Sequence, residues 1–377
     1  MARLTLPPPS ASLSWAQVLA FRTSRQLLVP RGTKRPVEVA RRLVGVQAQV
    51  ASAAELAVAV RRRSPRRGEV DRALADRTLV KTWAMRGTLH LLPADAAPLV
   101  LATLSRLRPW TAPAWERYHG VSKADVQRVL DALPDVLSGE PITREELGAA
   151  VVGRVRSTAV AAKLASGWSE LLKPAAFAGI LLQGPARDGR ATFVRSDSWV
   201  DGWRQHDPDE AGVELLRMYL AVYGPASVQH VADWWGRQRE TAVRPWFARL
   251  ADELVTVEVE GAVLFALRAD LAALRRTKPD HSVRLVSNFD QYFLGAGSGS
   301  AAFVPPKRKS RVSRAAGWIS PLVLRGGRVA GVWELDREAG RIEVEAFEPI
   351  PKPALAEEAA HLGRFLGREL SVRVGRG

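Results

Sequence analysis

The chain has 377 residues, of which 47% are hydrophobic, so it is long enough to bury a sizeable core in two or three domains. Its 55 Lys and Arg residues exceed its 39 Asp and Glu residues, which gives a formal net charge of +16 at pH 7. So basic a chain is attracted to nucleic acid, because bound Lys and Arg displace the counterions of phosphates. The alternative is an arginine-rich surface that is merely well solvated.

The composition also excludes several kinds of site. The sequence has no cysteine, which excludes disulfides, thiolate zinc sites and cysteine nucleophiles. Its six histidines do not include a pair at the i, i+4 spacing of a zinc-binding helix, so we expect neither a metal nor another cofactor. No apolar run is long enough for a signal peptide or a membrane span, and we expect a cytoplasmic, nucleoid-associated protein.

The first 120 residues predict four helices followed by a two-stranded hairpin. The helices are expected at 13–29, 36–44, 53–63 and 69–76, and the strands at 79–85 and 88–92. Ser12 or Ser14 is suited to cap the first helix, and Pro36 suits the first position of the second. Helices followed by a hairpin are typical of a winged-helix unit, in which the hairpin is the wing.

The same order of elements recurs twice. The second set has helices at 143–155 and 167–179 and strands at 180–184 and 191–195, and the third has helices at 211–224, 228–236 and 242–250 and strands at 254–259 and 263–267. Asp188 and Gly189, between the second pair of strands, are a strong hairpin signal. The rest of the chain reads as strands at 282–287, 317–324, 328–335 and 342–347 and a helix at 353–370.

We therefore predict an α+β protein with about three tandem winged-helix units and a C-terminal α+β segment. The expected boundaries are 1–120, 121–205, 206–270 and 271–377.

Basic side chains gather where winged helices present them to DNA. Arg86 stands at the expected tip of the first wing, and Arg187 and Arg190 flank the tip of the second. Such positions suit phosphate contact or entry into the minor groove. The residues expected to contact DNA are Arg61, Arg63, Trp83, Arg86, His90, Arg187, Arg190, Lys307, Arg308, Lys309 and Arg311. The alternative for each cation is simple solvation, and for Trp83 it is a place in the core.

Between the second and third helices lies the short motif Gln47-Ala48-Gln49. In an extended segment, residues i and i+2 point to the same side, so we expect both amides to be exposed and aimed together. Neutral amides can hold a water molecule, or stabilise a developing positive charge on a sugar, but they cannot act as a strong base. The alternative is a polar turn or a helix cap that only satisfies backbone groups.

Five stretches resemble the AlkZ-like winged-helix DNA glycosylases. They are LVGVQAQVASAAELAVAVRRR, LVKTWAMRGTLHLLPADAAPLV, YGPASVQHVADWWG, VRLVSNFDQYFLG and GWISPLVLRGGRVAGVWEL. The resemblance implies tandem winged-helix motifs around a concave DNA-binding face, and it implies that Gln47 and Gln49 are catalytic. A basic hairpin of that family matches the hairpin with Arg187 and Arg190. Asp290, in the similar Asn288-Phe289-Asp290 segment, is either structural or faces the DNA.

The resemblance further implies a monofunctional DNA glycosylase that removes bulky or crosslinking N7-alkylated purines from double-stranded DNA. N7 alkylation makes the base a good leaving group, so two amides that position water and offset the charge of the sugar would suffice. We expect a monomer. Two alternatives remain: a non-catalytic transcriptional regulator that binds a defined operator, and an architectural or protein-interaction module whose binding depends little on salt.

Overall fold

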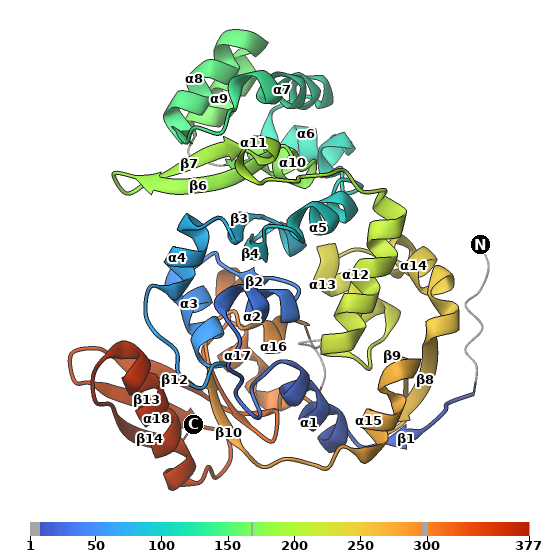
Figure 1. Cartoon of the computed structure of the whole chain (residues 1–377), viewed down its shortest axis with the longest axis vertical. Coiled ribbons are helices and arrows are strands. Elements are labelled where there is room, and N and C mark those ends of the chain that lie inside the picture. The colour runs from blue at the N-terminus through green and yellow to red at the C-terminus, as the bar shows by residue number, and fades with distance from the viewer. Residues whose placement is uncertain (1–7, 167–168, 296–300, 377) are drawn as a thin grey trace. The chain divides into compact units, whose positions relative to one another are not determined.

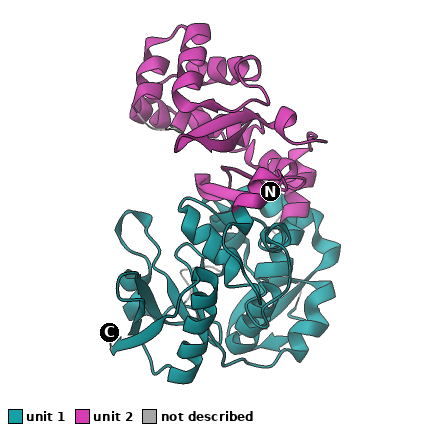
Figure 2. Cartoon of the chain, turned by 60° about the vertical axis from the view of Figure 1, so that its left-hand side comes forward, with its two compact units in different colours: residues 1–70, 216–377 teal, residues 71–215 magenta. Residues whose placement is uncertain are grey.

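The computed structural model describes residues 8–166, 169–295 and 301–376. Over these residues the chain is a mixed α+β protein, as predicted, and it forms two compact units (Figure 2). Unit 1 comprises Met1–Val70 and Leu216–Gly377, and unit 2 comprises Asp71–Leu215. These units are larger than the four expected segments, and the division into winged-helix segments stays a prediction. No helix in the described part of the chain is long and apolar enough to cross a membrane.

The N-terminal part of unit 1 contains the expected helices in shortened form. They are α1 (Trp15–Arg25), α2 (Pro36–Arg42), α3 (Ala51–Ala59) and α4 (Glu69–Ala75), the last of which leads into unit 2 (Figure 1). Ser14 is the residue that caps α1, because its hydroxyl oxygen accepts from the Gln17 N–H at 3.2 Å. A positive φ of 60° at Leu27 lies beyond the end of α1, where the sequence predicted that helix to continue.

The third predicted helix–hairpin segment is also present in unit 1. Its helices are α12 (Pro208–Tyr223), α13 (Val228–Gly236) and α14 (Arg244–Arg249), of which α12 begins in unit 2. The hairpin of β8 (Leu254–Val259) and β9 (Ala262–Leu267) is confirmed, and its register pairs Leu254 with Leu267. A short strand that was not predicted, β1 (Ser12–Leu13), pairs in parallel with β8.

A five-stranded sheet forms the C-terminal part of unit 1. Its strands run in the order β10 (Val283–Val286), β11 (Leu322–Arg325), β12 (Arg328–Asp336), β13 (Arg341–Ala346) and β14 (Ser371–Arg376). Helix α18 (Lys352–Leu366) connects β13 to β14, which pair in parallel. The predicted strand 317–324 is wrong in its first half, because Ala315–Gly317 is a 3₁₀ turn and the strand begins at Leu322. Strand β14 was not predicted.

Unit 2 confirms the other two predicted hairpins and joins them in one sheet. Its strands run in the order β4 (Leu89–Pro93), β3 (Leu79–Trp83), β6 (Leu181–Arg187), β7 (Arg190–Arg195) and β5 (Ile142–Thr143). The two hairpins meet where Lys81 of β3 pairs with Gln183 of β6.

The helices of unit 2 were predicted only in part. They are α5 (Ala97–Leu104), α6 (Pro113–His119), α7 (Lys123–Val136), α8 (Arg144–Val155), α9 (Thr158–Ala165), α10 (Leu172–Phe177) and α11 (Ser196–Trp199). Helix α8 matches its prediction. The predicted helix 167–179 is in part a 3₁₀ turn, Ser169–Leu171, followed by α10, and its first two residues lie outside the described residues.

Candidate active site

The Gln47-Ala48-Gln49 motif connects strand β2 (Val46–Gln47) to helix α3 (Ala51–Ala59) in unit 1. Gln47 is 6% exposed, whereas Gln49 lies on the surface. The expectation that both amides are exposed is therefore wrong for Gln47. The extended conformation ends after Gln47 and the chain bends at Gln49, so the alternation of a strand does not extend across the motif. One amide is held inside the protein and the other is open to solvent.

The helix that follows the motif is held at its C-terminal end by two arginines. Arg61 Nη1 donates to the Ala57 carbonyl oxygen at 2.7 Å, and Arg31 Nε donates to the Val60 carbonyl oxygen at 3.0 Å. These bonds provide donors for one carbonyl group in the last turn of the helix and one at its C-cap. By contrast, Val50 at the N-cap of α3 has no side chain that can accept hydrogen bonds from the first N–H groups of the helix.

Arg61 has a structural role in place of the expected DNA contact. Its side chain is fully buried and forms a two-point ion pair with the equally buried Asp290, with Nη2 to Oδ1 at 2.6 Å and Nη1 to Oδ2 at 2.8 Å. Of the two roles considered for Asp290, the structure supports the structural one. Arg61 lies just beyond α3, four residues after the buried Ala57, and this spacing could have indicated that its side chain turns inward.

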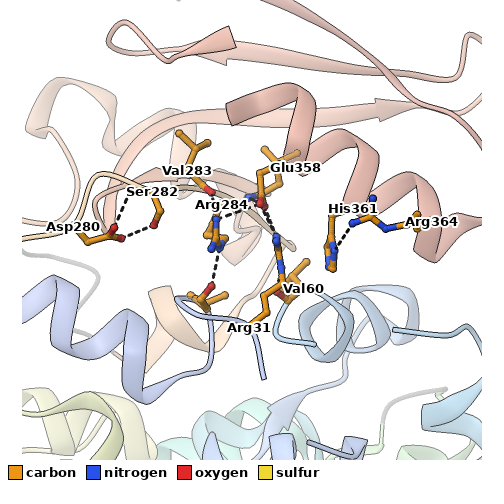
Figure 3. Close-up of polar contacts among 11 residues, drawn as sticks. Arg31, Val60, Asp280, Ser282, Val283, Arg284, Glu358, His361 and Arg364 are labelled. Atoms are coloured by element: carbon orange, nitrogen blue, oxygen red, sulfur yellow. Dashed lines mark hydrogen bonds and ion pairs between the residues drawn. The ribbon is translucent and has the colours of Figure 1, made fainter. Parts of the chain in front are cut away.

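Arg31 belongs to a second, partly buried ionic cluster, which Figure 3 shows. Both oxygens of Glu358, on α18, accept from Arg31 Nη2 at 2.6 and 2.7 Å, and Arg284 Nη1 lies 3.3 Å from Oε1. The Leu285 N–H donates to the same carboxylate at 3.0 Å. Glu358 is only 4% exposed, and these donors compensate for the cost of its burial. The cluster joins α18 and β10 to the chain segment before α2, and through Val60 to the end of α3.

The β3–β4 hairpin does not present two of the side chains that were expected to reach DNA. Trp83 is 6% exposed and stacks on Phe193, with ring centroids 6.0 Å apart, so it belongs to the core of unit 2. His90 is fully buried and its Nδ1 lies 2.9 Å from the Thr88 carbonyl oxygen. Burial, reinforced by the positive charge of Arg86, lowers the pKa of His90 to about 3. The expectation that Trp83 and His90 contact DNA is therefore wrong. Arg86 itself is half-buried in the turn between β3 and β4.

The β6–β7 hairpin places its two arginines on the surface, as expected. Arg187 ends β6 and Arg190 begins β7, and both are exposed. Positive φ angles of 52° at Asp188 and 74° at Gly189 form the tight turn that the Asp-Gly pair predicted. Arg187 forms an ion pair with Glu146, and Arg190 Nη2 lies 3.6 Å from Asp188 Oδ2. Surface ion pairs of this kind contribute little to stability.

The remaining expected contacts lie in unit 1. Arg63, Lys307, Lys309 and Arg311 are exposed, and Arg308 is half-buried with its guanidinium 5.2 Å from the Phe347 ring centroid. Within the basic run 307–311, Lys309 is the first residue of the short helix α17 (Lys309–Val312). Arg311 forms an ion pair with Glu345, and this contact lowers the pKa of that carboxyl group. The run is therefore partly anchored to the C-terminal sheet.

A pocket of about 470 Å³ in unit 1 was not predicted from the sequence. Residues of α3, β12 and α18 line it, and one of them is Ser52, three residues after Gln49. Segments so far apart in the chain gave no local signal that they would enclose a common space.

Comparisons with known proteins place the chain in a family. Residues 40–367 match the family described as DNA glycosylase AlkZ-like. The chain is 41% identical over 368 residues to an interstrand DNA cross-link repair glycosylase of Streptomyces sahachiroi, covering 96% of this chain and 99% of the relative. The solved structure of Streptomyces sahachiroi DNA glycosylase AlkZ matches with a TM-score of 0.93 and 40% identity, covering 97% of this chain and 100% of that one.

These findings confirm the resemblance seen in the sequence, and they do not favour the alternative of a non-catalytic regulator. The chain belongs to the AlkZ-like family and is a DNA glycosylase.

Proposed function

We propose that this glycosylase hydrolyses the N-glycosidic bond of bulky or crosslinking N7-alkylated purines, with Gln47 and Gln49 as its catalytic residues. The observation that supports this most is the Gln47-Ala48-Gln49 motif between β2 and α3, in a chain 41% identical to a relative named for interstrand cross-link repair. Such a reaction would release the base and, for a crosslink, separate one strand from the adduct.

Cleavage of this glycosidic bond requires little acid–base catalysis from the enzyme. An N7-alkylated purine carries a positive charge and leaves as a neutral base, so no strong general acid is required. The sugar that remains resembles an oxocarbenium ion, which carbonyl dipoles can stabilise and water can attack. An amide side chain has both an acceptor and donors, so two of them can hold the attacking water and face the sugar together.

The unequal burial of the two amides supports a different role in catalysis for each glutamine. Gln49 is exposed and is the residue that can approach the sugar and the water directly. Gln47 is 6% exposed, in an environment where a fixed dipole acts more strongly than in water. Positioned groups of this kind are effective because they need little reorganisation during the reaction. We therefore assign the water contact to Gln49 and the electrostatic support to Gln47.

We further infer that the three helix–hairpin segments act as winged-helix units that hold double-stranded DNA, and that the protein acts as a monomer. The exposed arginines of the β6–β7 hairpin and the basic run 307–311 would contact phosphates. Such contacts carry no sequence information, which suits an enzyme that must act at lesions in any sequence.

The test is release of base from two duplexes, one with a single N7-methylguanine and one with a nitrogen-mustard crosslink. We expect the protein to release base from both far faster than buffer does. A Gln47→Ala, Gln49→Ala double variant should lose this activity while it keeps its affinity for DNA. Release at the rate of buffer by the wild-type protein would refute the proposal.

A further inference from the structure

The pocket beside α3 is built as an apolar floor with a basic rim. Its floor is the outer edge of the hydrophobic core between α18 and the C-terminal sheet, with Trp333, Leu362 and Phe365 buried in that core. Leu335 of β12 and Leu366 of α18 are half-buried in the pocket wall. The Trp333 indole N–H donates to the Val286 carbonyl oxygen at 3.0 Å, so this polar group is already satisfied.

The rim of the pocket is positively charged. The lining residues include three arginines and one carboxylate, which are Arg67, Arg337, Arg368 and Glu55. All three arginines are exposed, whereas Glu55 Oε1 accepts from the Gly68 N–H at 2.7 Å. Arg368 Nη1 donates to the Arg337 carbonyl oxygen at 2.6 Å, which draws two of the arginine segments together. An apolar hollow with cations at its mouth fits a neutral group attached to a polyanion.

The pocket lies next to the catalytic motif. Ser52 lines it and follows Gln49 by three residues, so their Cα atoms are at most about 11 Å apart. A nucleotide bound at Gln49 would therefore lie within reach of the pocket. The cationic purine ring would be repelled by three arginines, whereas its flanking phosphates would be attracted to them. The apolar floor of the pocket is therefore suited to the apolar substituent on the base, and not to the charged purine ring itself.

We propose that this pocket, bounded by α3, β12 and α18, receives the alkyl or aryl substituent of an N7-alkylated purine, with phosphates of the same strand at its arginine rim. The proposal rests on the proposed function and specifies the substrate class. A volume of about 470 Å³ is within the range of sites for drug-sized molecules, so the enzyme accepts substituents much larger than methyl. Binding of the substituent contributes to recognition of bulky lesions, and N7-methylguanine does not gain from it.

The experiment fills the pocket and compares two lesions. One duplex carries N7-methylguanine and the other carries N7-(naphthylmethyl)guanine, and kcat/KM for base release is measured on both. Leu366→Trp and Leu335→Trp, on two different elements, each reduce the pocket volume. The matched control is Val374→Trp, at an exposed position of β14 in the same unit, outside the pocket lining and outside the three helix–hairpin segments. Thermal unfolding checks that each variant is folded.

We expect each filling variant to lower the ratio of kcat/KM for the naphthylmethyl over the methyl lesion by about ten- to a hundredfold. Val374→Trp should leave this ratio unchanged. If folded filling variants keep the wild-type ratio while the wild type releases both bases, the pocket proposal is overturned and the proposed function stands. If the wild type releases neither base, the proposed function itself fails and the pocket proposal fails with it.

Discussion

Arg61 and Asp290 lie 229 residues apart in the sequence and form a fully buried, two-point ion pair, with nitrogen–oxygen distances of 2.6 and 2.8 Å. Arg61 stands just after α3, and Asp290 directly precedes α16 (Gln291–Gly295). The Tyr292 N–H donates to Asp290 Oδ1 at 2.8 Å, which orients the carboxylate further. The helix that follows the Gln47-Ala48-Gln49 motif is thereby tied to the C-terminal part of the same unit.

Breaking this ion pair should destabilise the protein strongly. Asp290→Ala leaves a buried, uncompensated guanidinium, and we expect it to lower the free energy of unfolding by about 3–5 kcal/mol in urea titrations. The double variant Arg61→Leu, Asp290→Leu should recover much of this loss, because neither charge remains. The exposed pair of Arg244 and Glu240 is the control, and Arg244→Ala should cost about 1 kcal/mol or less. A small effect of Asp290→Ala would contradict the structural role of the pair.

The β6–β7 hairpin should contribute phosphate contacts to DNA binding. Removal of one arginine that binds a phosphate should reduce the slope of log K against log salt concentration by about 0.9. We therefore expect Arg187→Ala, Arg190→Ala to reduce this slope by about 1.8 and to weaken binding to undamaged duplex. Fluorescence anisotropy over a series of salt concentrations measures both quantities. A slope equal to that of the wild-type protein would show that the hairpin does not touch phosphates.

Buried histidines should make the fold sensitive to mild acid. Burial lowers the pKa of His90 from 6.5 to about 3, so the folded protein keeps it neutral while the unfolded chain protonates it below pH 6.5. The stability from this group is complete above pH 6.5 and is lost as the pH falls toward 3. His230 and His361, each with a pKa lowered mainly by burial to about 4, act in the same direction.

The variant His90→Asn isolates the contribution of one imidazole. Between pH 7 and pH 5, the wild-type free energy of unfolding should fall by about 2 kcal/mol more than that of His90→Asn. Asparagine can donate to the Thr88 carbonyl oxygen in place of Nδ1 and does not titrate in this range. Urea titrations at both pH values measure the difference. Parallel losses in the two proteins would mean that His90 is not the group responsible.

The fold could be predicted from sequence where the signal was local. The hairpins followed from turn residues such as Asp188 and Gly189, whose positive φ angles the structure confirms. The pairing of β3 with β6 and the parallel strand β14 were missed, because their partners are distant in sequence. Non-local pairing depends on how whole elements pack, and short apolar runs do not encode it.

The candidate site shows the same limit in its side chains. The exposure of Arg187 and Arg190 followed from their places at a hairpin turn, whereas Arg61 was misread because it stands in a run of arginines. Its partner Asp290 is too remote for spacing to reveal. Leu79, Lys81 and Trp83 share one side of β3, and this mixed pattern does not reveal that Trp83 packs on Phe193.

The most direct test of the central claim is the single-turnover rate of base release from a duplex with one N7-methylguanine, with the protein in excess. Gln47→Ala, Gln49→Ala and the double variant should all bind this duplex as the wild type does, and the double variant should release base at the rate of buffer. Because amides do not titrate, the wild-type rate should be constant between pH 6.5 and 8.5. A double variant as fast as the wild type would show that the two glutamines do not carry the reaction.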